Sequence, residues 1–513
     1  MSAHRQTLRE PAAEPAMAAG VAFGSGAGRW VLAVAVLGSG MAFLDGTIVN
    51  VALPAIGRDL HASTSALQWI LNGYLLTLAS LILLGGSLGD RLGRRRIFVI
   101  GTALFTVASL LCTIAPTVEA LVAARLFQGI GGALLTPGSL AMIESSFRVG
   151  DRPRAIGAWS GLVGVATAVG PLLGGYLVEA VSWRAAFLIN LPVGAFVLAS
   201  ARRVAETRDP TAAGRLDVLG AGLAVLGLAG VTYALIEAPA GFSASVALSG
   251  AVGMLALAAF LLLERRTGNP MMPLAIFSSR QFSAANAVTF VVYASLSGVF
   301  FLLVAFLQIS LGYSPVAAGA ASLPVTALML LFSARSGALA QRVGPRVPLT
   351  VGPLLIAAGM LLMSRVGPGD HYVPDVLPAV IVFGAGLTLV VSPVTATVLA
   401  AADARHSGIA SGINNAVARV ASLLAVAVLP LLAGLTGHNF YDPAAMTDGF
   451  HVAMLTCAGL VVAGGALAWL TISDDVLEAE PEHRGGQPVA VSTDYSCPVA
   501  GPPVHAEAGV RAG

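Results

Sequence analysis

Long apolar segments, separated by short polar or glycine-rich stretches, run through most of the chain. Three of them, Val31 to Phe43, Leu248 to Leu263 and Val420 to Leu432, contain no charged residue. A run of about 18 or more mostly apolar residues is long enough to cross a lipid bilayer. The pattern therefore predicts membrane-spanning helices rather than the amphipathic helices of a soluble domain.

Segments of this kind predict an all-α membrane protein of about fourteen transmembrane helices. They cover residues 30–56, 66–88, 97–115, 119–143, 154–178, 184–201, 216–237, 245–263, 282–307, 316–340, 347–365, 375–400, 407–433 and 449–472. Since the number of spans is even, both termini are expected on the same side of the membrane.

Composition supports this class and excludes several functions. The chain has 513 residues, of which 56% are hydrophobic and 11% charged, whereas soluble domains carry about 25% charged residues. It contains no lysine, which excludes a P-loop ATPase and a retinal Schiff base. The net charge of +2 gives no reason to expect a nucleic-acid partner. The scattered cysteines and histidines predict no metal site, and the alanine-rich, lysine-free composition is typical of a GC-rich bacterial genome.

The arginines predict how the chain is oriented. With the N-terminus in the cytoplasm, only Arg58, Arg184 and Arg365 fall outside, and Arg125, Arg335 and Arg419 fall within spans. All the others are cytoplasmic, as the positive-inside rule requires. We therefore expect a multi-pass protein of the cell membrane with both termini in the cytoplasm.

A motif occurs twice, 251 residues apart. Gly86 to Arg95 and Gly337 to Arg346 both read G-x-L-x-(D/Q)-R-x-G-x-R. The repeat predicts two parallel six-helix halves with the substrate site between them. The expected parts are an N-terminal tail (1–29), the first half (30–203), an inserted helix pair (204–280), the second half (281–472) and a disordered tail (473–513).

Two charged residues lie inside spans of the first half. A carboxylate in a membrane costs about 2.5–3.5 kcal/mol on insertion scales, so Asp45 is expected to face the bundle interior. It could handle a proton or cation, or serve as a structural hydrogen-bonding centre beside Gly46 and Asn50. Arg125 could shift the pKa of a neighbouring carboxylate or bind an anion, or it could simply form a fixed ion pair.

Glycine-containing motifs predict moving or tightly packed contacts. A gating latch is expected from Gly86, Asp90, Arg91, Gly93 and Arg94, with Arg342 in the second copy; plain cytoplasmic anchoring is the alternative. In the fifth span, Gly157, Gly161 and Gly164 and then Gly170, Pro171, Gly174 and Gly175 predict a close-packing face with a proline bend. This span suits a gate or a seal, or ordinary helix packing.

Polar residues in other spans are candidates for lining a substrate cavity, although each could equally be a packing or interface residue. They are Asn50, Trp69, Asn72, Tyr74, Gln308, Asn414, Asn415 and Arg419. No acidic residue lies between Glu264 and Asp370, so a dicationic substrate would find little buried negative charge. Glu237 is expected near the outer end of the seventh span.

Five motifs in order resemble those of the major facilitator superfamily, in particular its fourteen-span drug:proton antiporter family. They are the first-span motif 44–54, the loop motif 86–95, Arg125 with Gln128-Gly129, the antiporter motif 170–175 and the sixth-span signature 183–194. Gln341 stands where the first copy of the loop motif has Asp90, which weakens the second latch.

The resemblance implies proton-coupled export of lipophilic or amphipathic molecules by alternating access. It implicates Asp45 and Arg125 in coupling and places the inserted pair outside the two halves. The expected partners are a small-molecule substrate, protons and the bilayer, with no cofactor beyond the proton gradient and a monomeric state. An exporter of an endogenous metabolite or lipid and a passive facilitator are the alternatives; no catalytic set supports an enzyme.

Overall fold

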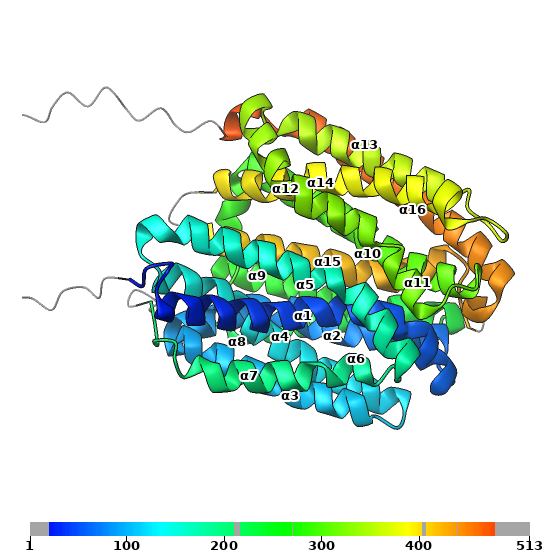
Figure 1. Ribbon diagram of the computed structural model, residues 1–513, viewed down its shortest axis with the longest axis horizontal. Coiled ribbons are helices and arrows are strands. Elements are labelled where there is room, and N and C mark those ends of the chain that lie inside the picture. Colours follow the sequence, from blue (N-terminus) through cyan, green and yellow to red (C-terminus); the bar gives the residue numbers. More distant parts are fainter. Residues whose placement is uncertain (1–19, 210–215, 269, 403–406, 438, 478–513) are drawn as a thin grey trace, which may run out of the picture. The chain divides into compact units, whose positions relative to one another are not determined.

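The chain forms helices along most of its described length. The computed structural model describes residues 20–209, 216–268, 270–402, 407–437 and 439–477, and within them the only strand-like pairing is a single bridge between Val21 and Phe147. The predicted tail segments 1–19 and 478–513 lie outside the described residues. The long helices run along roughly one common direction (Figure 1).

The helices form three consecutive groups. The first group is α1 (Gly26–Asp59), α2 (Thr64–Leu92), α3 (Arg94–Ile114), α4 (Val118–Ser146), α5 (Arg152–Ala180), α6 (Ala185–Leu188) and α7 (Asn190–Ala201). The second group is α8 (Val218–Glu237) and α9 (Ala244–Arg266). The third group is α10 (Arg280–Ile309), α11 (Pro315–Ala320), α12 (Leu323–Val343), α13 (Arg346–Met363), α14 (Leu377–Ala400), α15 (Ser407–Leu432) and α16 (Pro443–Thr471).

Polar residues between the apolar segments fix where many helices begin. The side chains of Ser25, Ser63 and Thr117 accept hydrogen bonds from backbone N–H groups in the first turns of α1, α2 and α4. Ser279 and Asp442 do the same for α10 and α16. Such N-caps satisfy N–H groups that have no partner within the helix and contribute about 1 kcal/mol each. The breaks that delimit the predicted spans therefore also start the helices.

The predicted all-α membrane fold is confirmed. Thirteen helices of the described part of the chain are long and apolar enough to cross a membrane. The predicted span 184–201 is shorter than the others, because it is divided into α6 and α7 and its apolar stretch is limited to Ala185–Ala201.

The first and third groups pack internally in the same pattern. Contacts of α2 with α4, α3 with α4, α1 with α5 and α3 with α7 correspond to those of α12 with α14, α13 with α14, α10 with α15 and α13 with α16. The inserted helices α8 and α9 pack on each other. Helix α8 also packs against α2 and α15, one helix from each larger group, so the pair lies where those groups meet.

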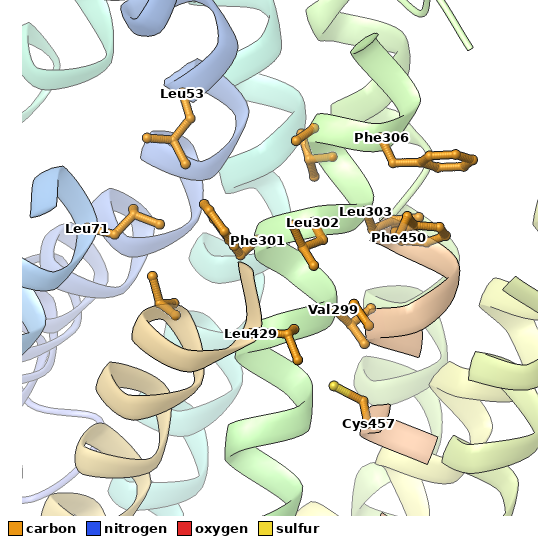
Figure 2. Close-up of a cluster of buried hydrophobic side chains, with 14 of the residues drawn as sticks. Leu53, Leu71, Val299, Phe301, Leu302, Leu303, Phe306, Leu429, Phe450 and Cys457 are labelled. Carbon is orange, nitrogen blue, oxygen red and sulfur yellow. The ribbon is translucent and has the colours of Figure 1, made fainter. Parts of the chain in front are cut away.

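A buried apolar cluster joins the first and third groups. Leu53 of α1 and Leu71 of α2 lie near Phe301 of α10 and Leu429 of α15 (Figure 2). Within a bilayer such side chains stabilise the contact through close packing rather than through removal from water. The two groups are therefore held together by apolar packing in addition to the polar contacts described next.

Hydrogen bonds between the first and third groups gather at the end of the bundle where α1 ends, here called the closed end. They include Gln308 Nε2 to Val51 O (3.1 Å), Gln68 Nε2 to Val426 O (2.7 Å), Thr64 Oγ1 to Gly437 O (2.9 Å) and Tyr441 Oη to Ala62 O (2.7 Å). Burial raises the pKa of Tyr441 to about 12, so its hydroxyl stays protonated and keeps donating near neutral pH.

The start of the predicted C-terminal tail is more structured than the sequence indicates. Asp474 to Leu477 form a 3-10 turn, and Asp474 Oδ1 accepts a hydrogen bond from Arg346 N at 3.2 Å. The run of acidic residues predicts solvation, but the first of them binds the beginning of α13.

Candidate functional site

Asp45 of α1 and Arg125 of α4 form an ion pair in the interior of the first group. Both residues are 0% exposed, and Arg125 Nη1 donates to Asp45 Oδ2. A pair removed from water in this way is stable only when its remaining hydrogen-bonding capacity is also satisfied.

Neighbouring amides complete the ion pair. Gln128 Nε2 and Asn190 Nδ2 donate to Asp45 Oδ1 at 2.8 and 3.1 Å. The same two nitrogens donate to Ser109 Oγ at 2.9 and 3.3 Å. Helices α1, α3, α4 and α7 thus all contribute to one network. Every contact to Asp45 comes from a donor, so the site is arranged around an ionised carboxylate.

Arg125 is held on its other sides as well. Its Nε donates to Ile70 O at 3.0 Å and its Nη1 donates to Gln128 Oε1 at 2.6 Å. The guanidinium carbon lies 4.5 Å from the centre of the Tyr74 ring and 5.8 Å from that of Phe187. These aromatic faces attract the cation, so Arg125 is fixed in place and cannot swing freely to another partner.

The sequence pointed to the two charges but not to the amides around them. Gln128 lies three residues after Arg125 on the same helix face, and Asn190 lies in the quoted sixth-span signature. The i, i+3 spacing was the available signal for Gln128. Ser109 carries no such signal, because a serine in a span is ordinarily satisfied by its own helix backbone.

The predicted latch is a structured turn between α2 and α3. Arg94 forms an ion pair with Asp90 at 2.8 Å, and Gly93 has φ +115°, a conformation that favours glycine. Arg91 makes further interactions. The close backbone approach predicted for Gly86 occurs one residue earlier, because a Cβ on Gly85 would collide with Ala133 O. A Cβ on Gly86 would be in ordinary contact with α4.

The last helix of each larger group is followed by an acidic residue. In both groups this residue caps the helix that begins at the end of the repeated motif. Glu206 accepts hydrogen bonds from Arg95 N and Arg96 N at the start of α3, at 3.0 and 3.1 Å. Asp474 occupies the corresponding place at α13. Arg342, in contrast, is exposed and makes no hydrogen bond or ion pair with the described residues. At the second copy of the motif, the turn is therefore held by the hydrogen bond from Arg346 N to Asp474 and not by the side chain of Arg342.

Removing either cap should lower stability by a similar amount. Glu206→Ala and Asp474→Ala each leave N–H groups at a helix start without an acceptor, which costs about 1 kcal/mol. The thermal unfolding temperature of the purified protein in detergent measures this change. Asp475→Ala, which removes an exposed neighbour of Asp474, should leave it unaltered; an equal loss in all three variants would contradict the capping role.

The end of α5 is tightly packed, and its beginning is not. A Cβ on Gly170 or Gly174 would collide with Thr47 or Ile48 of α1, and one on Gly175 would collide with Pro315 O of α11. Gly170 to Gly175 therefore touch both larger groups at the closed end, with Pro171 inside the helix.

The prediction that the earlier glycines of α5 form a packing face was wrong. A Cβ on Gly157, Gly161 or Gly164 meets no atom within 4 Å. Spacing by four residues places these glycines near one another on the helix surface, but no neighbouring helix approaches that surface in this conformation.

The cavity candidates divide among three places. Tyr74 belongs to the Asp45 network, and its hydroxyl donates to Ala42 O at 3.3 Å. Trp69 faces the inserted pair, where its Nε1 donates to Glu237 Oε1 at 3.0 Å. Glu237 lies at the end of α8, as expected. Gln308 is one of the closed-end contacts.

The remaining candidates belong to α1, α2 and α15. Asn50 donates to Gly46 O of its own helix, and Asn414 donates to Asn286 and Thr289 of α10. Asn72 is fully buried, and both of its side-chain polar atoms lack a partner among the described residues. Asn415 and Arg419 are partly buried on α15.

The helices, the two similar groups and the buried ion pair define a multi-pass membrane transporter. A model of the Major Facilitator Superfamily matches residues 35–426. The chain belongs to this superfamily, which confirms that part of the resemblance.

Individual proteins agree with this assignment. The chain is 39% identical to the tetracenomycin C resistance and export protein of Streptomyces glaucescens over 80% of its own length and 77% of the relative's. It is 36% identical to the puromycin resistance protein of Streptomyces alboniger, over 88% and 93% of the two chains. A crystal structure of a peptide transporter in complex with sulfate shares the fold, with a TM-score of 0.65, 15% identity and coverage of 88% and 96%.

Proposed function

We propose that the chain exports lipophilic or amphipathic small molecules from the cell in exchange for protons, by alternating access. The observation that carries the proposal is the fully buried Asp45, the acceptor of a complete donor network in the interior of the bundle. The names of the relatives, which are resistance and export proteins, support the direction of transport.

Protonation of Asp45 would act on the donors around it. A neutral carboxyl no longer balances Arg125, and it becomes a hydrogen-bond donor itself. Asn190 Oδ1, which has no partner among the described residues, could accept that hydrogen after the amide rotates. Proton uptake therefore weakens the contact between α1 and α4 and stabilises a different arrangement of the same side chains.

Helix α1 offers a path from this site to the closed end. Thr47 and Ile48 lie two and three residues after Asp45 and pack against Gly170 and Gly174 of α5. Helix α5 in turn touches α11 at the closed end. A shift of α1 on protonation would therefore alter the contact between the two larger groups, which is what coupling requires. In this scheme the closed end faces outward and the repeated loop motifs face the cytoplasm.

A dedicated exporter of an endogenous metabolite is the second candidate. The name of the tetracenomycin C relative combines resistance with export of one compound, which favours this role. Both candidates use the same machinery; a narrow substrate range would distinguish the dedicated exporter.

A resistance profile tests the proposal. Cells expressing the chain are compared with empty-vector cells for growth on tetracenomycin C, puromycin and ethidium, and for intracellular ethidium with and without a protonophore. Expression should raise the tolerated concentration of at least one compound, and the protonophore should abolish exclusion of that compound. Exclusion that persists without a proton gradient would contradict proton coupling, and no protection at all would contradict export.

A further inference from the structure

Arg125 and Arg419 both lie well inside spans, away from the helix ends, and of these two only Arg125 has a counter-charge. Arg125 is paired with Asp45. Arg419 on α15 makes no hydrogen bond or ion pair with the described residues, and its buried Nε has no partner. A charged group inside a membrane protein is stable when it faces a partner or a polar cavity. Arg419 is therefore able to receive a negatively charged or strongly accepting group from outside the chain.

Arg419 lies where the two larger groups meet. Its guanidinium carbon is 5.1 Å from the centre of the Phe43 ring on α1. Helix α15, which carries Arg419, packs against α2 of the first group and α10 of the third. Arg419 therefore lies at the contact between the two groups, in the position expected for a substrate site.

Helices α10 to α15 of the third group offer Arg419 no acidic partner, because they contain no aspartate or glutamate. Asp45 belongs to the first group and is already occupied by Arg125, Gln128 and Asn190. The positive charge of Arg419 is therefore left unbalanced in the only conformation described.

We propose that Arg419 binds the acidic group of the exported molecule, so that preferred substrates are amphipathic organic anions, with a carboxylate, sulfonate or phenolate on an aromatic body. The inference rests on the proposed export function and names its substrate class. Arginine suits planar anions because its guanidinium can donate two parallel hydrogen bonds. Phe43 offers an aromatic surface for the body, and Asn415, one turn before Arg419, offers a further donor.

A matched pair of ligands isolates the charge. Thermal unfolding of the purified full chain is measured with 2-naphthoate and with the neutral 2-naphthamide. Naphthoate should stabilise the wild type at much lower concentrations than naphthamide. Arg419→Gln should weaken naphthoate binding about tenfold or more, since hydrogen bonds to charged groups are the strong ones, and should leave naphthamide binding unchanged. Arg419→Lys should retain part of the preference.

Arg335→Gln serves as the control, because Arg335 also lies within a span of the third group, away from its ends, and is exposed. It should behave like the wild type. No stabilisation of the wild type by naphthoate, or equal binding by Arg419→Gln, would overturn the inference. Transport measurements distinguish a failure of this inference from a failure of the proposed function. In inverted vesicles, protonophore-sensitive uptake of ethidium with no preference for anions would support export and overturn the role of Arg419. Anion binding without driven uptake of carboxyfluorescein would sustain Arg419 and contradict proton-coupled export.

Discussion

Asp45→Asn should abolish proton-driven accumulation of substrate while the protein still inserts into the membrane. Asparagine keeps the size of the side chain and can still accept from Gln128 or Asn190, but it cannot carry a proton. Accumulation in inverted vesicles should fall about tenfold or more, toward passive leakage, as expected when a coupling energy is lost.

The variant also leaves Arg125 without its counter-charge, and breaking a buried pair is strongly destabilising. The double variant Asp45→Asn with Arg125→Gln separates the two effects, because it removes both charges. It should recover thermal stability without recovering accumulation. Full transport in Asp45→Asn, or recovery of driven transport in the double variant, would contradict a proton-carrying role for Asp45.

Gly175→Ala should trap the protein with its closed end open. The added Cβ would collide with Pro315 O and lie 2.7 Å from Val316 Cα, and neither backbone atom can move away cheaply. Overpacking of this kind costs about 1–3 kcal/mol, which disfavours the closed arrangement by about 5–150-fold. Transport should slow accordingly.

Gly161→Ala is the matched control on the same helix, because a Cβ there meets no atom within 4 Å. A cysteine replacing Ala62, which is 3% exposed at the closed end, reports the opening through its reaction with a membrane-impermeant maleimide. Labelling should rise with Gly175→Ala and stay low with Gly161→Ala. Equal labelling in both variants would show that the contact of α5 with α11 does not hold that end shut.

The spans and the two buried charges were predictable because the signal for each of them lies within one segment of the sequence. An uninterrupted apolar segment can satisfy its backbone in a membrane only as a helix. A charge such as Asp45 within it requires a partner, and Arg125 was the available cation of the same half. Physical constraints on one segment at a time were sufficient for these features.

Contacts between distant segments were not predictable in this way. Glu206 lies in a loop with no motif, yet it caps α3 more than a hundred residues earlier in the sequence. Trp69 has the character of a cavity or interface residue, but its partner Glu237 lies on the inserted pair. Gly161 has the spacing of a packing glycine without a neighbour to pack against. Each outcome depends on which helices meet, and one sequence does not specify that.

Coupled exchange requires that protons move when substrate is added. Inverted vesicles containing the protein are acidified inside, and the luminal pH is followed while the compound to which expression confers most resistance is added. We expect immediate alkalinisation with the wild type and none with Asp45→Asn. Accumulation of the compound by the wild type with no change in luminal pH would show that export is not driven by exchange for protons.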